Sequence, residues 1–431
     1  MPRAKLKAQK VEAANALLEG RALPQGGAWI TRARSAAEKR VRELGLPTKR
    51  DEYWRYTDPR RLTAADVEPG ALHDTQGEPP AFDAFDRVKL VFVDGVFDAD
   101  ASDPMALEGV EICQLSQAAM TDLHWARDLY GSLEARGQSP VERPLASLNT
   151  AYATQGVLIR ITGKPEKPIS LIYHRESETS DAMVHHVIRV ESGAEATILE
   201  NGPFATRFNQ VMEVDIADGG TLHHIRAQGR DHERVGCAHF FARLGAGSHL
   251  KSFTLTANGA LIRNDSVIWL DGAAGSAHVA GATVGDGAFH HDDTVFITHG
   301  APRCESRQVF KKVLRRSAVG VFQGKILVNQ VAQLTDGYQI SQSLLLDEDA
   351  QFLAKPELEI YADDVKCSHG STSGEIDSNQ LFYLRARGVP EDTAKTLLVL
   401  AFLAEALDEI AEPAYAEDLR ARLEAWFERR G

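Results

Sequence analysis

The sequence contains 431 residues, of which 43% are hydrophobic, and its formal net charge of −13 at pH 7 gives a pI near 5.6. This length predicts two or three structural parts, and the acidic balance without a long lysine- and arginine-rich run argues against a nucleic-acid partner. The four cysteines are scattered without a C-x-x-C pair, which gives no sign of a zinc ribbon or a disulfide framework and fits reduced cytoplasmic thiols.

The sequence also gives no sign of a membrane segment. The N-terminus begins with basic residues but lacks the apolar core that a secretory signal needs. The most apolar stretch, residues 397–407, is too short to span a bilayer and contains Glu405. We therefore expect a soluble, cytoplasmic protein.

Residues 1–155 carry the signals of a mixed helical and β region. Two runs with apolar residues every three to four positions predict helices that end by Gly45. The aromatic and charged cluster at residues 49–57 predicts an anchor in which Tyr53, Trp54 and Tyr56 pack down while the charges stay in water, and a ligand platform is the less ordinary alternative. Two apolar runs around an Asp-Gly turn predict a hairpin over residues 88–97, and residues 115–154 form a helical interval.

Residues 156–373 lack helical periodicity and consist of short β-branched runs separated by glycine-rich corners. Similar corners recur at Gly193, Gly219, Gly245 and Gly272, with spacings of 26, 26 and 27 residues. A fixed period of this size is typical of stacked coils, each of which buries its apolar face against its neighbours. A parallel β-helix and a sandwich of short antiparallel strands both fit, and the near-constant period favours the β-helix.

Histidines are frequent in this β region, often as adjacent pairs, and Asp292 and Asp293 are adjacent as well. Adjacent residues in a strand point to opposite faces, so each pair offers at most one ligand per face. Stacked coils could align histidines into a ladder, but surface or packing positions are the more ordinary explanation. The same alternation counts against a carbohydrate-active enzyme, which needs paired carboxylates in one groove.

Residues 374–431 turn helical. A cap at Asp377 or Ser378 predicts a short helix, and Pro390 opens a second helix that is apolar nearly all round. Such a helix needs burial or a partner helix. We expect Pro413 to end it, with a last amphipathic helix beyond.

The segment 356–390 joins a strand pattern to a helix start, with Cys367 and His369 between them. Residues two apart in an extended segment point to the same face, so the thiol and the imidazole would project side by side. Together they suit a soft or borderline metal, although such a site normally takes three or four ligands and a half-buried cysteine often only packs. No phosphate loop, nucleophile elbow, H-E-x-x-H or EF-hand pattern is present, and no catalytic residue is assigned.

Residues 357–407, together with the Tyr-Trp-Arg-Tyr-Thr cluster at 53–57, resemble the SufB/SufD family of iron–sulfur cluster assembly proteins. The resemblance covers nearly the whole chain. It implies a mainly β fold, with a right-handed parallel β-helix core over residues 156–373. An N-terminal α+β region (residues 1–155) and a C-terminal helical domain (residues 374–431) would flank this core.

Two departures place the resemblance on the SufD branch. The segment 338–345, Tyr-Gln-Ile-Ser-Gln-Ser-Leu-Leu, lacks the scaffold cysteine of the SufB branch. His369 is followed by Gly370, where the SufB branch has a His-Glu pair. The resemblance therefore implies a non-catalytic partner of the scaffold, and the primary cluster ligand would lie on the other subunit.

The resemblance further implies a complex with one SufB-like paralogue and two SufC-like ABC ATPase subunits. Cys367 and His369 would lie at the SufB interface as ligands of iron or of a transient cluster shared with SufB. This chain alone would not bind the iron or the cluster tightly. Without its partners the chain could form a homodimer. The C-terminal helices would dock on the ATPase through Phe382, Tyr383, Arg385, Pro390, Leu397 and Leu398.

Two alternatives come from other classes of protein. The chain would be a purely structural adaptor for the ATPase if Cys367 and His369 are inert. It would be an unrelated carbohydrate-active β-helix protein if the family resemblance fails.

Overall fold

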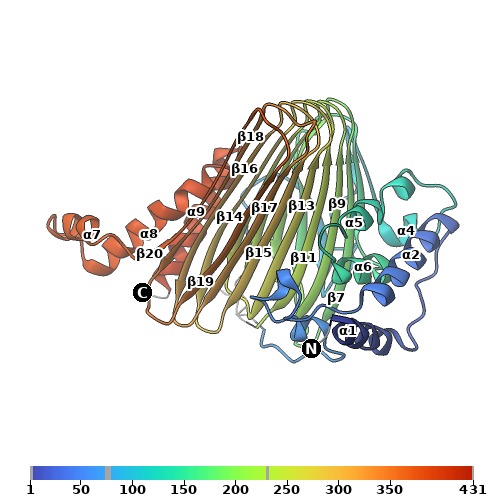
Figure 1. The fold of residues 1–431 in the computed structure, drawn as a ribbon, viewed down its shortest axis with the longest axis horizontal. Coiled ribbons are helices and arrows are strands. Elements are labelled where there is room, and N and C mark those ends of the chain that lie inside the picture. The colour runs from blue at the N-terminus through green and yellow to red at the C-terminus, as the bar shows by residue number, and fades with distance from the viewer. Residues whose placement is uncertain (1–2, 73–78, 230–232, 430–431) are drawn as a thin grey trace.

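The computed structural model describes residues 3–72, 79–229 and 233–429. The protein is mainly β, with a parallel β-solenoid between N-terminal and C-terminal helices (Figure 1). Successive solenoid strands along the chain enter two facing sheets alternately, so each coil contributes one strand to each sheet. The predicted parallel β-helix is thereby confirmed, and the antiparallel sandwich is wrong.

Each of the two sheets has ten strands. In spatial order, sheet A contains β2 (Val96–Asp98), β1 (Val88–Val93), β6 (Ile169–His174), β8 (Glu195–Gly202), β10 (Thr221–Gly229), β12 (His249–Ala257), β14 (Ser276–Asp286), β16 (Glu305–Arg315), β18 (Thr335–Leu345) and β20 (Val365–Gly374). Sheet B contains β19 (Gln351–Ile360), β17 (Val319–Val328), β15 (His290–His299), β13 (Leu261–Leu270), β11 (Val235–Leu244), β9 (Arg207–Ile216), β7 (Asp181–Val190), β5 (Val157–Ile161), β4 (Val110–Gln114) and β3 (Ala106–Leu107).

The strand register explains the repeat in the sequence. From β6 to β20, partners in neighbouring strands of sheet A lie between 26 residues apart, as for Glu195 and Thr221, and 31 residues apart, as for Glu305 and Asp336. The corner glycine Gly193 has a φ of 70°, a left-handed conformation that glycine adopts without steric cost. The corners therefore set where each coil turns from one sheet into the next.

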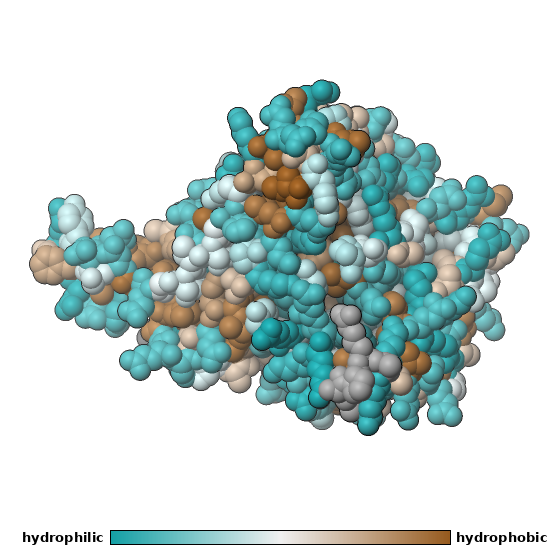
Figure 2. All heavy atoms as spheres, in the orientation of Figure 1, coloured by the Kyte–Doolittle hydropathy of each residue, from teal (hydrophilic) through white to brown (hydrophobic). Residues whose placement is uncertain are grey.

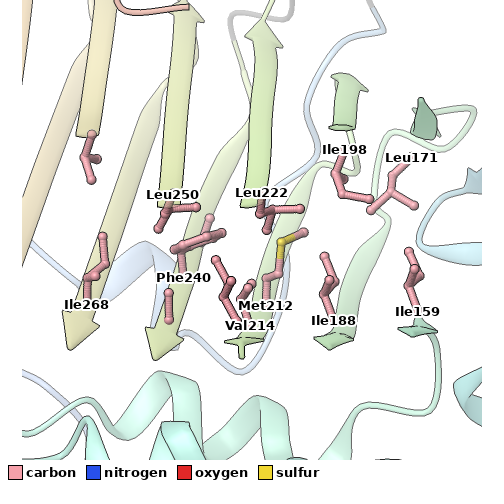
Figure 3. Packing of buried hydrophobic residues seen from close by; sticks show 14 of the residues in the cluster. Ile159, Leu171, Ile188, Ile198, Met212, Val214, Leu222, Phe240, Leu250 and Ile268 are labelled. Carbon is pink, nitrogen blue, oxygen red and sulfur yellow. The ribbon is translucent and has the colours of Figure 1, made fainter. Parts of the chain in front are cut away.

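A continuous apolar core lies between the sheets (Figure 3). Its members are buried and come mostly from the two sheets, as the fully buried Ile188, Met212 and Ile268 of sheet B and Ile198, Leu222 and Leu250 of sheet A illustrate. Burying each such side chain contributes about 1.5–3 kcal/mol. The stacked coils are thus held together mainly by contacts with their immediate neighbours.

The two ends of the solenoid differ. At the closed end, β1 pairs with β6 and turns back as the predicted hairpin into β2, while the antiparallel strands β3 and β4 pair alongside β5. At the open end, β20 and β19 are the outermost strands of sheets A and B within the described residues. Side chains of β19 and β20 are half-buried or exposed.

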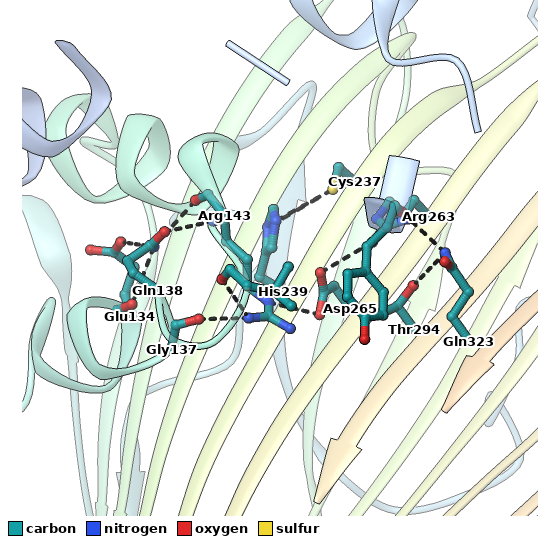
Figure 4. A network of polar contacts seen from close by, with 12 residues as sticks. Glu134, Gly137, Gln138, Arg143, Cys237, His239, Arg263, Asp265, Thr294 and Gln323 are labelled. Carbon is teal, nitrogen blue, oxygen red and sulfur yellow. Dashed lines mark hydrogen bonds and ion pairs between the residues drawn. The ribbon is translucent and has the colours of Figure 1, made fainter. Parts of the chain in front are cut away.

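The N-terminal helices cover the outer face of sheet B (Figure 1). They are α1 (Arg3–Leu18), α2 (Ala28–Leu44), η1 (Glu52–Trp54), α3 (Arg60–Thr63), α4 (Leu115–Ala118), η2 (Trp125–Asp128), α5 (Ser132–Arg136) and α6 (Pro144–Tyr152). A buried polar network attaches them to the strands, in which Arg143 donates to Asp265 at 3.0 Å (Figure 4). Tyr53 and Trp54 are buried while Arg55 is exposed, which confirms the predicted anchor.

The C-terminal helices are α7 (Ser378–Arg385), α8 (Glu391–Leu407) and α9 (Pro413–Glu428), and α8 and α9 lie on the outer face of sheet A. Asp377 caps α7 as predicted, because its side chain accepts from the backbone N–H groups of Asn379 and Gln380. The prediction for Pro413 was wrong: α8 ends at Leu407, and Pro413 stands in the first turn of α9, where its missing N–H costs nothing. Across the described parts of the chain, every helix is too short or too polar to cross a bilayer.

Candidate functional site

Cys367 and His369 lie on β20, the outermost strand of sheet A. The register with β18 places Gly337 opposite Cys367 and Gln339 opposite His369. Because the two residues are separated by one position in a regular strand, their side chains leave the same face. The fold therefore brings this predicted pair together at the open end of the solenoid.

Cys367 is half-buried and packs against an apolar cluster that includes Ile326 and Leu358 of sheet B. A Cβ at Gly337 would lie 3.3 Å from its Sγ, so the glycine leaves space for the sulfur. Burial raises the pKa of the Cys367 thiol above its ordinary value. Metal binding by Cys367 would thus have to displace a proton, because the thiolate is the ligand form.

The His369 side chain is exposed and has no hydrogen-bond or ion-pair partner in the described part of the chain. A neutral imidazole is a common metal ligand, so this side chain is available for coordination. No group of three or more His, Cys, Asp and Glu side chains able to hold a metal occurs among the described residues. Two donors leave a coordination shell incomplete, and a partner at the open end would have to supply the others.

A second C-x-H sequence, Cys237-Ala-His239, occurs on β11 and was missed in the sequence analysis. The Cys237 Sγ lies 3.5 Å from Nε2 of His239, and both side chains are buried beneath the N-terminal helices (Figure 4). Burial raises the pKa of Cys237 and lowers that of His239 to about 4. This pair is closed off from solvent, so spacing alone does not identify the accessible site.

The histidines of the β region do not form a ladder, because no register within the described strands pairs one histidine with another. Several instead join buried polar clusters. Inside the solenoid, Glu200 accepts from His224 at 2.7 Å, from Arg226 at 2.6 Å and from Tyr173 at 2.8 Å. Burial favours the neutral acid, but Arg226 and His224 hold the pKa of Glu200 well below its usual range. Such a satisfied network fixes the packing of the coils.

Asp292 and Asp293 face opposite sides of β15, as predicted. Asp292 accepts from Thr57 at 2.6 Å on the outer face, and Asp293 accepts from Lys312 at 2.6 Å between the sheets. Both carboxylates are buried and paired, so they do not form the open carboxylate pair of a glycosidase.

The residues predicted to dock a partner lie on the arm formed by α7 and the start of α8, which projects from the body (Figure 1). Helix α7 buries none of its residues, and Phe382, Tyr383 and Leu397 are 73%, 55% and 48% exposed. Arg385 pairs with Glu391 at 3.1 Å in solvent, Pro390 is exposed and Leu398 is half-buried. Figure 2 shows apolar and polar surface side by side on this arm.

A second apolar surface adjoins the open end and was also missed. Val331, Leu334, Ile360 and Tyr361 are 66%, 52%, 39% and 60% exposed. Their two loops touch, since the Leu334 N–H donates to the Asp364 carbonyl at 2.6 Å. Exposed apolar side chains beside unpaired strand edges are typical of a surface that another chain covers. Three of these four residues lie in loops, where periodicity gives no signal.

The chain matches two known sequence families. Residues 173–402 match the family described as SUF system FeS cluster assembly, SufBD core domain, and residues 24–171 match the SufBD protein N-terminal region. Among curated proteins it is similar to the iron–sulfur cluster assembly protein SufD of Escherichia coli, with 28% identity covering 91% of this chain and 93% of that protein. It is also similar to SufD of Bacillus subtilis, with 25% identity covering 90% and 91%, and to a SufBD family protein of Synechocystis, with 29% identity covering 88% and 87%.

Proposed function

Because the chain belongs to the SufBD family of iron–sulfur cluster assembly proteins and is SufD-like, we propose that it is the SufD-type subunit of a SufBCD complex. In this complex it pairs with a SufB-like paralogue and binds two SufC-like ABC ATPase subunits jointly with that paralogue. It supports iron acquisition and cluster assembly without being a catalyst itself. Its place of action is the cytoplasm.

The observation that carries this proposal is the open end of the solenoid. The outer edges of β19 and β20 leave backbone groups without a strand partner within the described chain, and a second solenoid end would satisfy them. The same contact would cover the apolar loop residues Val331, Leu334 and Tyr361. A chain without its partner would use this edge to pair with a second copy.

Iron or a nascent cluster is the cargo of this interface. His369 is accessible and supplies an imidazole ligand, while Cys367 either ligates as thiolate or packs beside it. On the neighbouring strand β18, Ser341 and Ser343 form hydrogen bonds to Ser371 and Ser373 at 3.2 and 3.0 Å. This chain therefore offers hydroxyls rather than a thiolate on that segment, which supports a shared site whose main ligands come from the SufB-like partner.

The exposed arm of α7 and α8 supports ATPase docking. A helix that exposes Phe382 and Tyr383 and buries none of its residues gains stability only when another surface covers it. The arm continues directly from β20 through residues 375–377, but its exposed side chains lie on helices and not on the outer strand edges, so each partner would bind its own set of residues.

The first test is anaerobic affinity purification of the tagged full chain from its host, with its partners identified and quantified. Recovery of a longer paralogue with an ABC-type ATPase is the expected result. Ile360→Lys should lose the paralogue and keep the ATPase, while Phe382→Asp should weaken ATPase binding through the arm. Recovery of the chain without either partner would overturn the proposal.

A second test separates a ligand role from a purely structural adaptor. His369→Ala should lower cluster delivery in cells while the complex still assembles. Ser368→Ala is the matched control, because its side chain leaves the opposite face of β20. Unchanged delivery in the His369→Ala strain would support the adaptor and remove His369 as a ligand.

A further inference from the structure

A cavity of about 370 Å³ lies far from Cys367 and His369, on the outer face of sheet A. Its floor is formed by the C-terminal ends of β6, β8, β10 and β12, and helix α9 and residues 80–81 cover it. This volume lies within the range of about 300–1,000 Å³ that small-molecule sites occupy.

The walls of the cavity are largely apolar and partly aromatic. Ile172, Ala227 and Leu255 line it from the sheet, and Leu423 and Trp426 line it from α9. Trp426 is 4% exposed, and it stacks edge-on against Phe427 with ring centroids 4.8 Å apart. A rigid indole beside aliphatic side chains suits the flat face of a ring-sized ligand.

One buried polar side chain on the cavity lacks a partner. Asn201 is 4% exposed, and its Oδ1 accepts no hydrogen bond from the described residues. An unsatisfied buried acceptor of this kind destabilises the fold, because the oxygen has lost its hydrogen bonds to water without gaining a replacement. A ligand that donates an N–H or O–H to Asn201 would remove this cost.

The charged side chains among the described lining residues of the cavity are basic. His174, Arg175, Arg422 and Arg429 line it, and no aspartate or glutamate belongs to its described lining, although the chain carries a net charge of −13. Arg175 donates to the carbonyl oxygen of Ser177 at 3.1 Å, and Arg422 pairs with Asp418 at 3.2 Å just outside the cavity. Guanidinium groups held by neighbouring groups in this way are preorganised for an acidic ligand.

We propose that this cavity binds a small organic anion with a ring-sized apolar body and a hydrogen-bond donor. The ring lies against Trp426 and Leu255, the donor reaches Oδ1 of Asn201, and the carboxylate or phosphate lies among the arginines. The site does not depend on the partners or on iron, so binding occurs in the isolated full chain.

The proposal is tested with three probes that share one ring and its N–H group and differ in charge. Fluorine NMR titrations of the full chain with 5-fluoroindole-3-acetate, the neutral fluorinated alcohol and the protonated fluorinated amine measure the contribution of charge. We expect the acetate to bind at least about tenfold more tightly than the amine, because the arginines attract the carboxylate and repel the ammonium group. A tenfold difference in affinity corresponds to about 1.4 kcal/mol. Equal binding of all three probes, or no binding of the acetate at millimolar concentration, would overturn the proposal.

Two variants locate the bound acetate. Leu255→Trp fills the cavity and should abolish binding, and Asn201→Leu removes the acceptor and should weaken binding about fivefold, which is a typical loss for one hydrogen bond. Phe382→Ala, on the distant arm, is the control and should leave binding unchanged. If Leu255→Trp does not fold, the affinity of Asn201→Leu for the acetate tests the location of the site. Unchanged affinity in Asn201→Leu would show that the acetate does not bind in this cavity.

Discussion

The closed and open ends of the solenoid differ in whether the chain covers its own strand edges. Every stack of strands ends in an edge that is prone to pair with other chains. At the closed end the chain covers its own edges with short antiparallel strands, and Phe92 beneath them is fully buried. At the open end Ile360 and Tyr361 remain exposed. The comparison teaches that the part of the fold that the chain leaves uncovered is where the proposed partner would bind.

The largest expected effect concerns packing at the two ends. Phe92→Ala should lower the free energy of unfolding by about 3–5 kcal/mol, because it leaves a cavity among fully buried neighbours. Phe352→Ala at the open end should cost about 1–2 kcal/mol, because that ring is only partly buried. Urea unfolding of both variants measures the difference. Equal losses would show that the open end is packed as firmly as the closed one.

Acid should weaken the closed end through His186. Burial lowers the pKa of His186 from 6.5 to about 3, while Val157 N–H donates to its Nδ1 at 3.2 Å. The unfolded chain takes up the proton first, so this stabilisation is complete above pH 6.5 and is lost as pH falls toward 3. His186→Gln should flatten the pH dependence of the unfolding free energy by about 1.4 kcal/mol per pH unit.

Denaturant unfolding between pH 7 and 4 measures this slope. The exposed His249, replaced in the same way, is the control. A pH dependence that His186→Gln leaves unchanged would assign the acid sensitivity to other buried groups, such as Glu200.

Charge on a strand edge should matter at one end only. Ile360→Lys should weaken pairing with the paralogue, or with a second copy, by at least about tenfold, because the interface would bury an unpaired ammonium group. Val96→Lys is the matched control, since Val96 is 57% exposed at the closed end. Sedimentation velocity measures both associations. Equal loss in the two variants would remove the distinction between the ends.

The smallest effect is expected on the arm. Phe382→Ala should change the free energy of unfolding by less than about 0.5 kcal/mol, because the ring is 73% exposed. Leu403→Ala, on the buried face of α8, should cost about 2–5 kcal/mol in the same urea experiment. A loss above about 1 kcal/mol for Phe382→Ala would mean that α7 packs against the body and is not free to dock.

The sequence predicted the features that depend on local pattern. The corner glycines predicted the coils, the Asp-Gly turn predicted the hairpin β1–β2, and Asp377 predicted the start of α7. The closed end of the solenoid was not predictable from local pattern, because β1 pairs with β6 across a long segment of chain. Such long-range pairing depends on tertiary packing and leaves no repeating pattern of apolar residues or glycine corners in the sequence.

The candidate site shows the same limit. Cys237-Ala-His239 and Cys367-Ser-His369 have identical spacing, yet the first pair is buried under helices and the second lies at the open end. Only the position of each strand in the stack distinguishes them, and no local signal encodes that position. The family resemblance selected the second pair because the motif that carries it, residues 357–407, contains Cys367 and His369 and not Cys237 and His239.

The return of the C-terminal helices along sheet A has a mechanical consequence. Helix α8 packs against β14 and β16, and the cluster that α8 and α9 bury reaches back to Leu199 of β8 and Ile225 of β10. These helices therefore connect several coils along the outer face of sheet A. A pull applied at α7 would load two connections at once, because residues 375–377 join α7 to the last strand, β20, while α8 packs against β14 and β16. Part of a force applied at the arm would therefore reach the middle of the solenoid through α8 and α9 and would not fall on the last strand alone.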